Sequence, residues 1–236
     1  MTIIVTILVF TLCSMTPGMV FADRTKPMSS WQYAMQRAIK RFGVKGRGRL
    51  VPYFERANVH YPPRKIGLLT FKKERKLELW AMGLKHHWHH IKSYPLTKYS
   101  GDFGPKLHDH DDQIPEGIYH ISWLNPQSIM HLSMKLNYPN RFDKQHASWR
   151  DRGNMGGDIF IHGGRLSVGC VAVGDSAIEE LFDLVYRVGR QHVEVINAPN
   201  DLRKSRPVHG HKPIPRWAPE LYRKIELALL KYHETV

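Results

Sequence analysis

The chain has 236 residues, and its 35 Lys and Arg against 21 Asp and Glu give a formal charge of +14. This length suits one domain with a sizeable core plus extensions. A charge this basic predicts attraction to polyanions.

Residues 1–22 are expected to form a signal peptide. They carry no charged side chain, contain an apolar run from Ile3 to Cys13, and end on Val20-Phe21-Ala22, which resembles a signal-peptidase site. A retained N-terminal anchor is the alternative, although the run is shorter than the roughly twenty residues of a bilayer-spanning helix. Export makes nucleic acid an implausible partner and favours carboxylate-rich peptidoglycan or anionic lipid headgroups. It also leaves Cys170 as the only cysteine, so an internal disulfide is excluded.

Residues 23–63 are predicted to form an N-terminal helix and a linker. Ser29 and Gln32 have the spacing of a capping box. The residues that follow recur at helical spacing on one apolar face: Trp31, Met35, Ile39 and Phe42. The glycine- and arginine-rich segment 43–49 is predicted as a loop with solvated charges.

Residues 64–198 read mainly as strands. A hairpin is expected with arms at 66–71 and 77–80 about a charged turn at 72–75. Further strands are predicted at 87–93, 118–123, 158–162, 168–173 and 192–196. One helix interrupts them, with Ser176 and Glu179 at capping-box spacing. Its expected core stripe consists of Ile178, Leu181, Phe182, Val185 and Tyr186. Residues 199–236 form a basic extension, whose final helix, 220–233, is expected to pack back on the domain.

A histidine and a cysteine flank a glycine-containing turn. His162 ends a short apolar strand, and Cys170 follows eight residues later. A thiol near its free pKa is mostly protonated at neutral pH, so a nucleophilic cysteine needs a neighbouring base. His162 can accept that proton and return it to a leaving amine. Gly169 lets a substrate backbone approach the sulfur, and the amides around Cys170 are candidate oxyanion donors. The alternative is an inert buried cysteine beside a core histidine.

Two short motifs carry a resemblance to a known family. His162-Gly163 and Ser167-Val168-Gly169-Cys170 resemble the active-site motif of the L,D-transpeptidase (YkuD-type) catalytic domain. Further segments extend the resemblance: Tyr99-Ser100-Gly101, Gly104-Pro105-Lys106, Pro115-Glu116-Gly117-Ile118-Tyr119, Leu124-Asn125-Pro126 and Asn137-Tyr138-Pro139-Asn140. The resemblance implies a mainly β, sandwich-like fold of two packed sheets with a few helices, an α+β arrangement over residues 64–198.

The resemblance also implies a reaction that needs no metal or other cofactor. The Cys170 thiolate attacks the carbonyl of a diaminopimelate residue in a peptidoglycan stem peptide, and a thioester forms. An amine then resolves it into a cross-link or attachment, or water resolves it into a cleaved product. Gly163, Ser167 and Gly169 are the expected positioning residues.

The motif departs from the commoner family pattern at two places. Val168 stands where that pattern has a histidine, and Val171-Ala172 where it has an arginine. Binding of a substrate carboxylate is therefore left to another basic residue, with Lys106 and Arg165 as candidates. Glu116 is a candidate to shape the cleft and Tyr138 to line it. Their alternative roles are a turn residue and a packed aromatic.

Both departures occur in a branch of single-domain periplasmic members that includes a murein-lipoprotein-releasing amidase. The resemblance thus implies a periplasmic location and stem peptides as partners, with peptidoglycan-bound outer-membrane lipoprotein as a further candidate. Two rival functions remain open. The segments 86–90 and 108–112 are rich in histidine and aspartate and could bind zinc or copper, although no His-Glu-x-x-His helix is present. A non-catalytic module could instead dock on the wall through its basic surface.

Overall fold

The computed structural model describes residues 28–147, 154–211 and 213–233. The predicted signal peptide lies outside these residues, and no helix within them is long and apolar enough to cross a membrane. The strands are β1 (Ile66–Phe71), β2 (Lys76–Met82), β3 (Trp88–Pro95), β4 (Gly117–Asn125), β5 (Ser133–Leu136), β6 (Phe160–His162), β7 (Val171–Ala172) and β8 (Val193–Ala198). The α-helices are α1 (Ser30–Ala38), α2 (Val44–Arg56), α3 (Arg141–His146), α4 (Asp175–Val188) and α5 (Ala218–Leu229). Shorter turns are the π-helix η1 (Ile39–Gly43) and the 3-10 helices η2 (Leu84–His86) and η3 (Arg190–His192).

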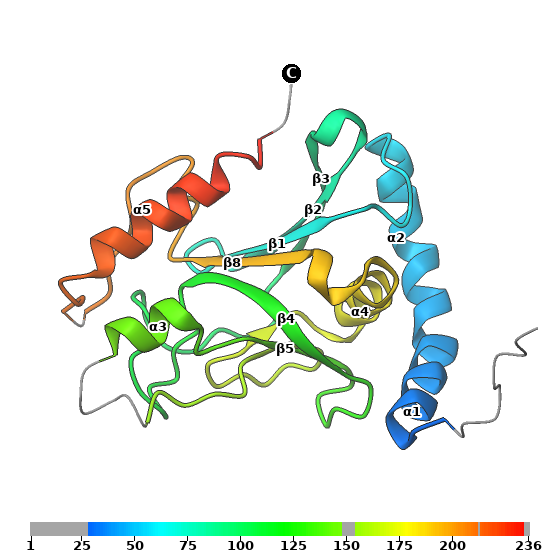
Figure 1. Cartoon of the computed structure of the whole chain (residues 1–236), viewed down its shortest axis with the longest axis horizontal. Helices are drawn as coiled ribbons and strands as arrows, with labels where there is room; N and C mark the ends of the chain where they lie inside the picture. Colours follow the sequence, from blue (N-terminus) through cyan, green and yellow to red (C-terminus); the bar gives the residue numbers. More distant parts are fainter. Residues whose placement is uncertain (1–27, 148–153, 212, 234–236) are drawn as a thin grey trace, which may run out of the picture.

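The strands form one sheet in the order β3-β2-β1-β8-β4-β5-β6-β7. The expected hairpin is confirmed as β1 and β2, which pair antiparallel, while β8 adds to β1 in parallel. β4 continues the sheet past β8: its first half pairs with β8 and its second half with β5. Figure 1 shows β4 crossing from the layer of β8 to that of β5. The mainly β fold with a few helices is therefore confirmed, and the two expected layers are joined through β4.

Both faces of β1 are buried, which explains its unbroken apolar sequence. Ile66 and Leu68 belong to the cluster that packs against α4, whereas Leu69 and Phe71 belong to a second cluster under α5. Gly67 allows this second contact, since a Cβ there would lie 2.5 Å from the Tyr232 ring. The predicted packing of the C-terminal helix is thus confirmed, and Figure 1 shows α5 on the side of the sheet away from α4.

The N-terminal helix begins with the predicted capping box, in which Ser29 and Gln32 cap each other's backbone N–H. The predicted loop at 43–49 is wrong, because the chain stays helical through η1 and α2 as far as Arg56. A Cβ at Gly46 would lie 2.7 Å from the Glu179 carbonyl oxygen, so this glycine serves a close approach of α2 to α4. The glycines of this segment allow α2 to pack closely against α4, and they do not break the helix.

Two further expectations need correction. Helix α4 begins at Asp175 after Gly174, and no side chain caps it. Glu179 pairs with Arg49 of α2, and it does not close a capping box with Ser176. The predicted core stripe of α4 is buried except for Tyr186, which is 45% exposed. The strand predicted at 168–173 shortens to β7, because Gly169 adopts a left-handed φ of 78°.

Candidate active site

His162 ends β6, and its imidazole is almost fully buried. Its Nδ1 lies 2.5 Å from the carbonyl oxygen of Gly163. A carbonyl only accepts, so Nδ1 carries the proton and donates it. The hydrogen bond therefore leaves Nε2 with its lone pair, which is the form that a general base requires.

Cys170 directly precedes β7, the strand that runs parallel to β6. Ile161 pairs with Val171 and His162 with Ala172, and the first pair, Ile161 and Val171, is buried in the core. Side chains alternate along a strand, so Cys170 and His162 share the opposite face. The sequence-predicted pair is thus brought to one side of the sheet. No hydrogen bond joins the two side chains directly.

The thiol is held by the backbone of the segment that leads into β6. The Phe160 N–H donates to Sγ at 3.4 Å, and the thiol donates to the Asp158 carbonyl at 3.7 Å. Burial raises the pKa of the Cys170 thiol, and it outweighs the lowering by the Phe160 N–H and the positive charge of Lys106. Burial likewise lowers the pKa of His162. Both groups are therefore neutral at neutral pH.

A tight turn presents the cysteine. The Ser167 hydroxyl donates to the Cys170 carbonyl at 2.6 Å, and the Gly169 N–H donates to the Ser100 hydroxyl at 2.7 Å. A Cβ at Gly169 would lie 3.1 Å from the Gln113 carbonyl, so this position is close to a second loop. Ser100 lies in one of the segments that carry the family resemblance, but the sequence assigned it no role.

Gly163 packs under the start of α4. A Cβ there would lie 2.7 Å from Oδ1 of Asp175 and 2.9 Å from the Ile178 side chain. The same Asp175 oxygen accepts the Gly164 N–H at 2.7 Å. The turn after His162 is therefore pinned to α4, and Asp175 is a second residue that the sequence analysis missed.

The two basic candidates differ in their surroundings. Lys106 is buried and donates to Oδ1 of Asp111 at 2.5 Å and to the His108 carbonyl at 2.9 Å. It also lines a cavity of about 230 Å³ that Trp217 of the C-terminal extension helps to form. Arg165 is exposed in the turn between His162 and Cys170. The positive charge of Lys106 thus influences the pKa of the Cys170 thiol, while the Arg165 side chain is exposed to solvent.

The other two candidates are buried. Glu116 is paired with Lys72 inside the protein. The Tyr138 hydroxyl donates to the carbonyls of Met155 and Lys106 at 3.2 and 3.4 Å. Both side chains therefore support the loops around the site, as a buried carboxylate and a packed aromatic.

The described residues contain no group of three or more His, Cys, Asp or Glu that could hold a metal ion, so the metal-binding alternative gains no support there.

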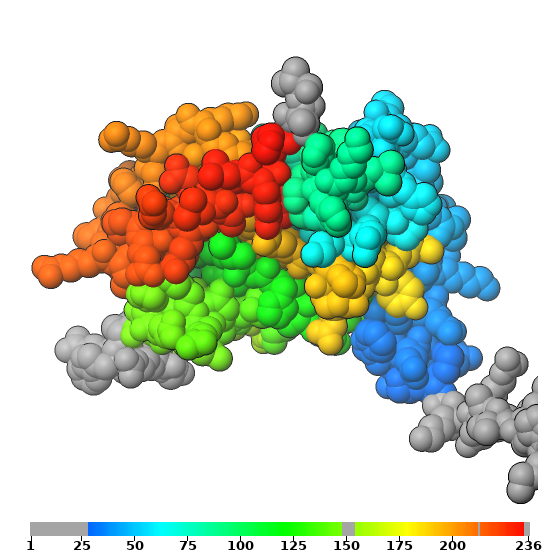
Figure 2. Space-filling model, turned by 45° about the horizontal axis from the view of Figure 1, so that its top comes forward, coloured from blue at the N-terminus to red at the C-terminus, as the bar shows by residue number. Residues whose placement is uncertain are grey.

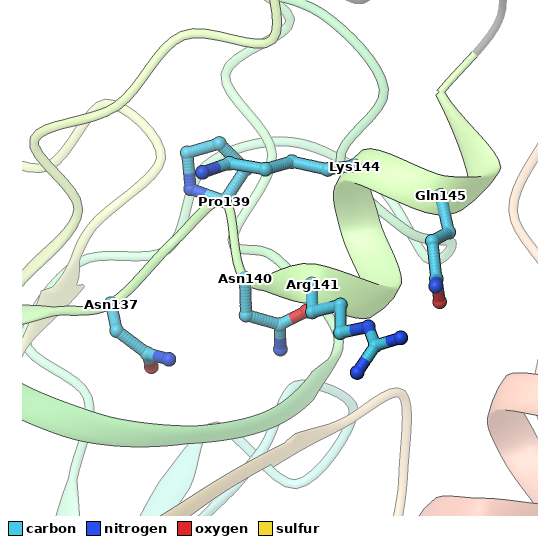
Figure 3. A pocket seen from close by; sticks show the side chains of 6 residues that line it. All are labelled: Asn137, Pro139, Asn140, Arg141, Lys144 and Gln145. Carbon is cyan, nitrogen blue, oxygen red and sulfur yellow. The ribbon is translucent and has the colours of Figure 1, made fainter.

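A hollow of about 510 Å³ lies beside α3, away from the catalytic pair, and Figure 3 shows its lining side chains. They are Asn137, Pro139, Asn140, Arg141, Lys144 and Gln145. Neither His162 nor Cys170 is among them.

Comparison with known proteins gives a family match. The family model of the L,D-transpeptidase catalytic domain, YkuD, matches residues 72–206. The putative L,D-transpeptidase YafK of Escherichia coli strain K12 is 34% identical over 123 residues, which are 51% of this chain and 47% of that protein. The YafK protein of Escherichia coli O157:H7 gives the same values. The chain thus matches about half the length of these curated relatives.

Two solved structures are also similar. The helical cell shape determining protein Pgp2 from Campylobacter jejuni has a TM-score of 0.47 at 21% identity, with 58% of this chain and 48% of that chain covered. Bd1075 from Bdellovibrio bacteriovorus has a TM-score of 0.43 at 22% identity, with 70% and 54% covered.

Proposed function

The chain belongs to the L,D-transpeptidase catalytic-domain family, and from this premise we propose that it is a peptidoglycan enzyme that transfers or hydrolyses stem peptides through Cys170. The observation that carries the proposal is the hydrogen bond from Nδ1 of His162 to Gly163, which leaves Nε2 free as a base. The proposal places the protein in the periplasm, where peptidoglycan lies.

The first half-reaction begins from two neutral groups. The raised pKa of Cys170 and the lowered pKa of His162 disfavour a preformed thiolate and imidazolium pair. Proton transfer from Sγ to Nε2 therefore accompanies attack on the diaminopimelate carbonyl. The S–C bond forms, the amide C–N bond breaks, and Nε2 returns the proton to the leaving amine.

The tetrahedral intermediate needs a donor for its oxyanion. The Gly169 N–H is engaged by Ser100, so it is not that donor. The Cys170 N–H has no acceptor within the described part of the chain. A backbone N–H beside the nucleophile is suited to this task, and we assign it to Cys170. Ser167 and Gly163 are positioning residues, since they hold the nucleophile's turn and the base.

The second half-reaction decides the product. An amine that attacks the thioester gives a cross-link or an attached protein, and water gives cleavage. Release of a peptidoglycan-bound outer-membrane lipoprotein would be the second type. Arg165 is the proposed contact for a substrate carboxylate, because it is exposed in the turn that joins the catalytic pair. Lys106 is the proposed electrostatic support.

The test compares three full-length proteins: the wild type, Cys170→Ala and Cys13→Ser. Each is incubated with lipoprotein-bearing sacculi and with free tetrapeptide muropeptides, and the products are identified by mass spectrometry. Cys13 is the other cysteine of the chain, so Cys13→Ser is the matched control and should keep full activity.

Released lipoprotein without new cross-links identifies the hydrolase, and new diaminopimelate cross-links identify the transpeptidase. Either product must vanish in Cys170→Ala alone. If the wild type leaves every substrate unchanged, the proposed reaction is wrong and wall binding becomes the function to test.

A further inference from the structure

Residues 28–54, which include α1, η1 and α2 except its last two residues, are strongly basic. Residues 28–54 contain six basic residues and no Asp or Glu: Arg37, Lys40, Arg41, Lys45, Arg47 and Arg49. Only Arg49 is neutralised locally, through ion pairs with Glu179 and Glu180 at 2.7 and 3.0 Å. None of the other five forms an ion pair with a carboxylate of the described residues. This segment therefore carries much of the chain's positive charge in unpaired form.

Three of these basic residues line a groove. Arg37, Lys40 and Arg41 border a hollow of about 830 Å³ between the helix and the turn at Pro126 and Gln127. Tyr33 lines the same hollow, one turn before Arg37. Figure 2 shows this segment, in blue, at the edge of the molecule. We name the surface formed by Tyr33, Arg37, Lys40 and Arg41 the basic groove.

Apolar side chains accompany the basic groove. Tyr33 is 64% exposed, and Trp31 and Met28 are each 40% exposed. The Trp31 indole N–H donates to the Leu124 carbonyl, which holds this ring against the end of β4. Aromatic rings beside Lys and Arg are typical of surfaces that meet the headgroup region of a membrane.

We propose that the basic groove binds anionic phospholipid headgroups and holds the protein against a membrane surface. The lipid phosphates would meet Arg37, Lys40 and Arg41, while Tyr33 reaches the level of the headgroups. Residues 23–29 separate the uncharged stretch 1–22 from α1, so α1 is the first described helix after any membrane that this stretch enters. The proposal does not depend on the catalytic reaction.

The test measures co-sedimentation of the full-length protein with vesicles. One set contains phosphatidylglycerol in phosphatidylcholine, and the other contains phosphatidylcholine alone. The variant Arg37→Glu/Lys40→Glu/Arg41→Glu reverses the groove. The matched control, Arg206→Glu/Arg216→Glu/Arg223→Glu, makes the same charge change at exposed residues of the C-terminal extension. All of these proteins contain residues 1–22, so any contribution of that stretch to vesicle binding is the same in each of them.

Wild type should bind the anionic vesicles more tightly than the neutral ones, and salt should weaken this binding. Reversal of the groove should weaken partition by at least about 100-fold, since each of the three basic residues near an anionic surface contributes roughly fivefold. The control should retain most of the binding, and Cys170→Ala should bind as the wild type does. A glutamine version of the groove variant, with circular dichroism, separates loss of binding from loss of folding.

Two results would overturn the proposal. One is equal binding by the groove variant and the control. The other is binding of wild type to lipoprotein-free sacculi, lost in the groove variant, with no binding to anionic vesicles. That second result would make the groove a wall-binding surface.

Discussion

Lys72 and Glu116 form an ion pair at 2.9 Å in which neither side chain is exposed to solvent. Lys72 also donates to the Gly104 carbonyl at 3.1 Å, and Glu116 accepts the Gly104 N–H at 2.8 Å. The pair therefore ties the β1-β2 turn to Gly104, in the loop between β3 and β4. This loop includes Gln113, whose carbonyl lies against Gly169 beside the nucleophile.

Lys72→Met should destabilise the protein by about 3–5 kcal/mol, because it leaves the Glu116 charge buried without a partner. Urea unfolding followed by circular dichroism measures the effect. Lys73→Met, at the exposed neighbouring position, is the control and should change stability by less than about 0.5 kcal/mol. The double variant Lys72→Met/Glu116→Leu should be more stable than Lys72→Met. Equal, small effects at positions 72 and 73 would contradict the argument.

Gly46 and Gly48 give a second matched pair, two residues apart in α2. Gly46→Ala should destabilise by about 1–3 kcal/mol, since its Cβ would meet the backbone of α4. Gly48 has open space around its Cβ position, so Gly48→Ala should stabilise the helix by roughly 0.5–1 kcal/mol. Thermal unfolding of both variants decides the sign. A stabilising Gly46→Ala would mean that the two helices do not pack as closely as described.

This pair of glycines also shows where sequence reasoning reached its limit. Alternating and continuous apolar residues identified the hairpin 66–80 and the β8 strand, because burial dictates such patterns locally. The sequence predicts a loop that includes Gly43 and Gly46, because a sequence does not reveal which helix a glycine must pack against. Long-range contacts were hidden for the same reason.

The residues of the candidate site fall into the same two groups: those that a local pattern predicts and those that depend on long-range contacts. His162 and Cys170 were predicted from a short local motif, and the structure brings them to one face of the sheet. Ser100 lies 69 residues from the amide that it accepts, so no local pattern assigns it that partner. The sequence leaves Glu116 open between a cleft role and a turn role, because its buried partner Lys72 is 44 residues away. Short motifs predict the reacting groups, while the residues that hold these groups in place depend on contacts that the fold creates.

The pKa of Cys170 can be tested through its rate of alkylation by iodoacetamide, measured in a Cys13→Ser background so that one thiol reacts. Burial raises the pKa of Cys170, so the rate should still be rising at pH values above the ordinary thiol range of about 8.5. Lys106→Met removes a positive charge that lowers this pKa, and the profile should move to higher pH. Asp158→Asn removes a negative charge that raises the pKa, and the profile should move to lower pH. Shifts in the same direction would contradict the electrostatic description.

The pH profile of kcat/KM tests His162 as the base. The imidazole accepts a proton only when neutral, so activity is lost as pH falls through its pKa. Burial lowers that pKa, so the acid limb should lie below the ordinary histidine value of about 6.5. The raised thiol pKa keeps Cys170 protonated across neutral pH, so activity should show a plateau there. Ser100→Ala removes the acceptor of the Gly169 N–H and should reduce kcat several-fold, while the acid limb stays in place. His162→Ala should lose the acid limb together with most of the activity. A wild-type acid limb well above 6.5 would mean that the pKa of His162 is not lowered, and would contradict the described burial of the imidazole.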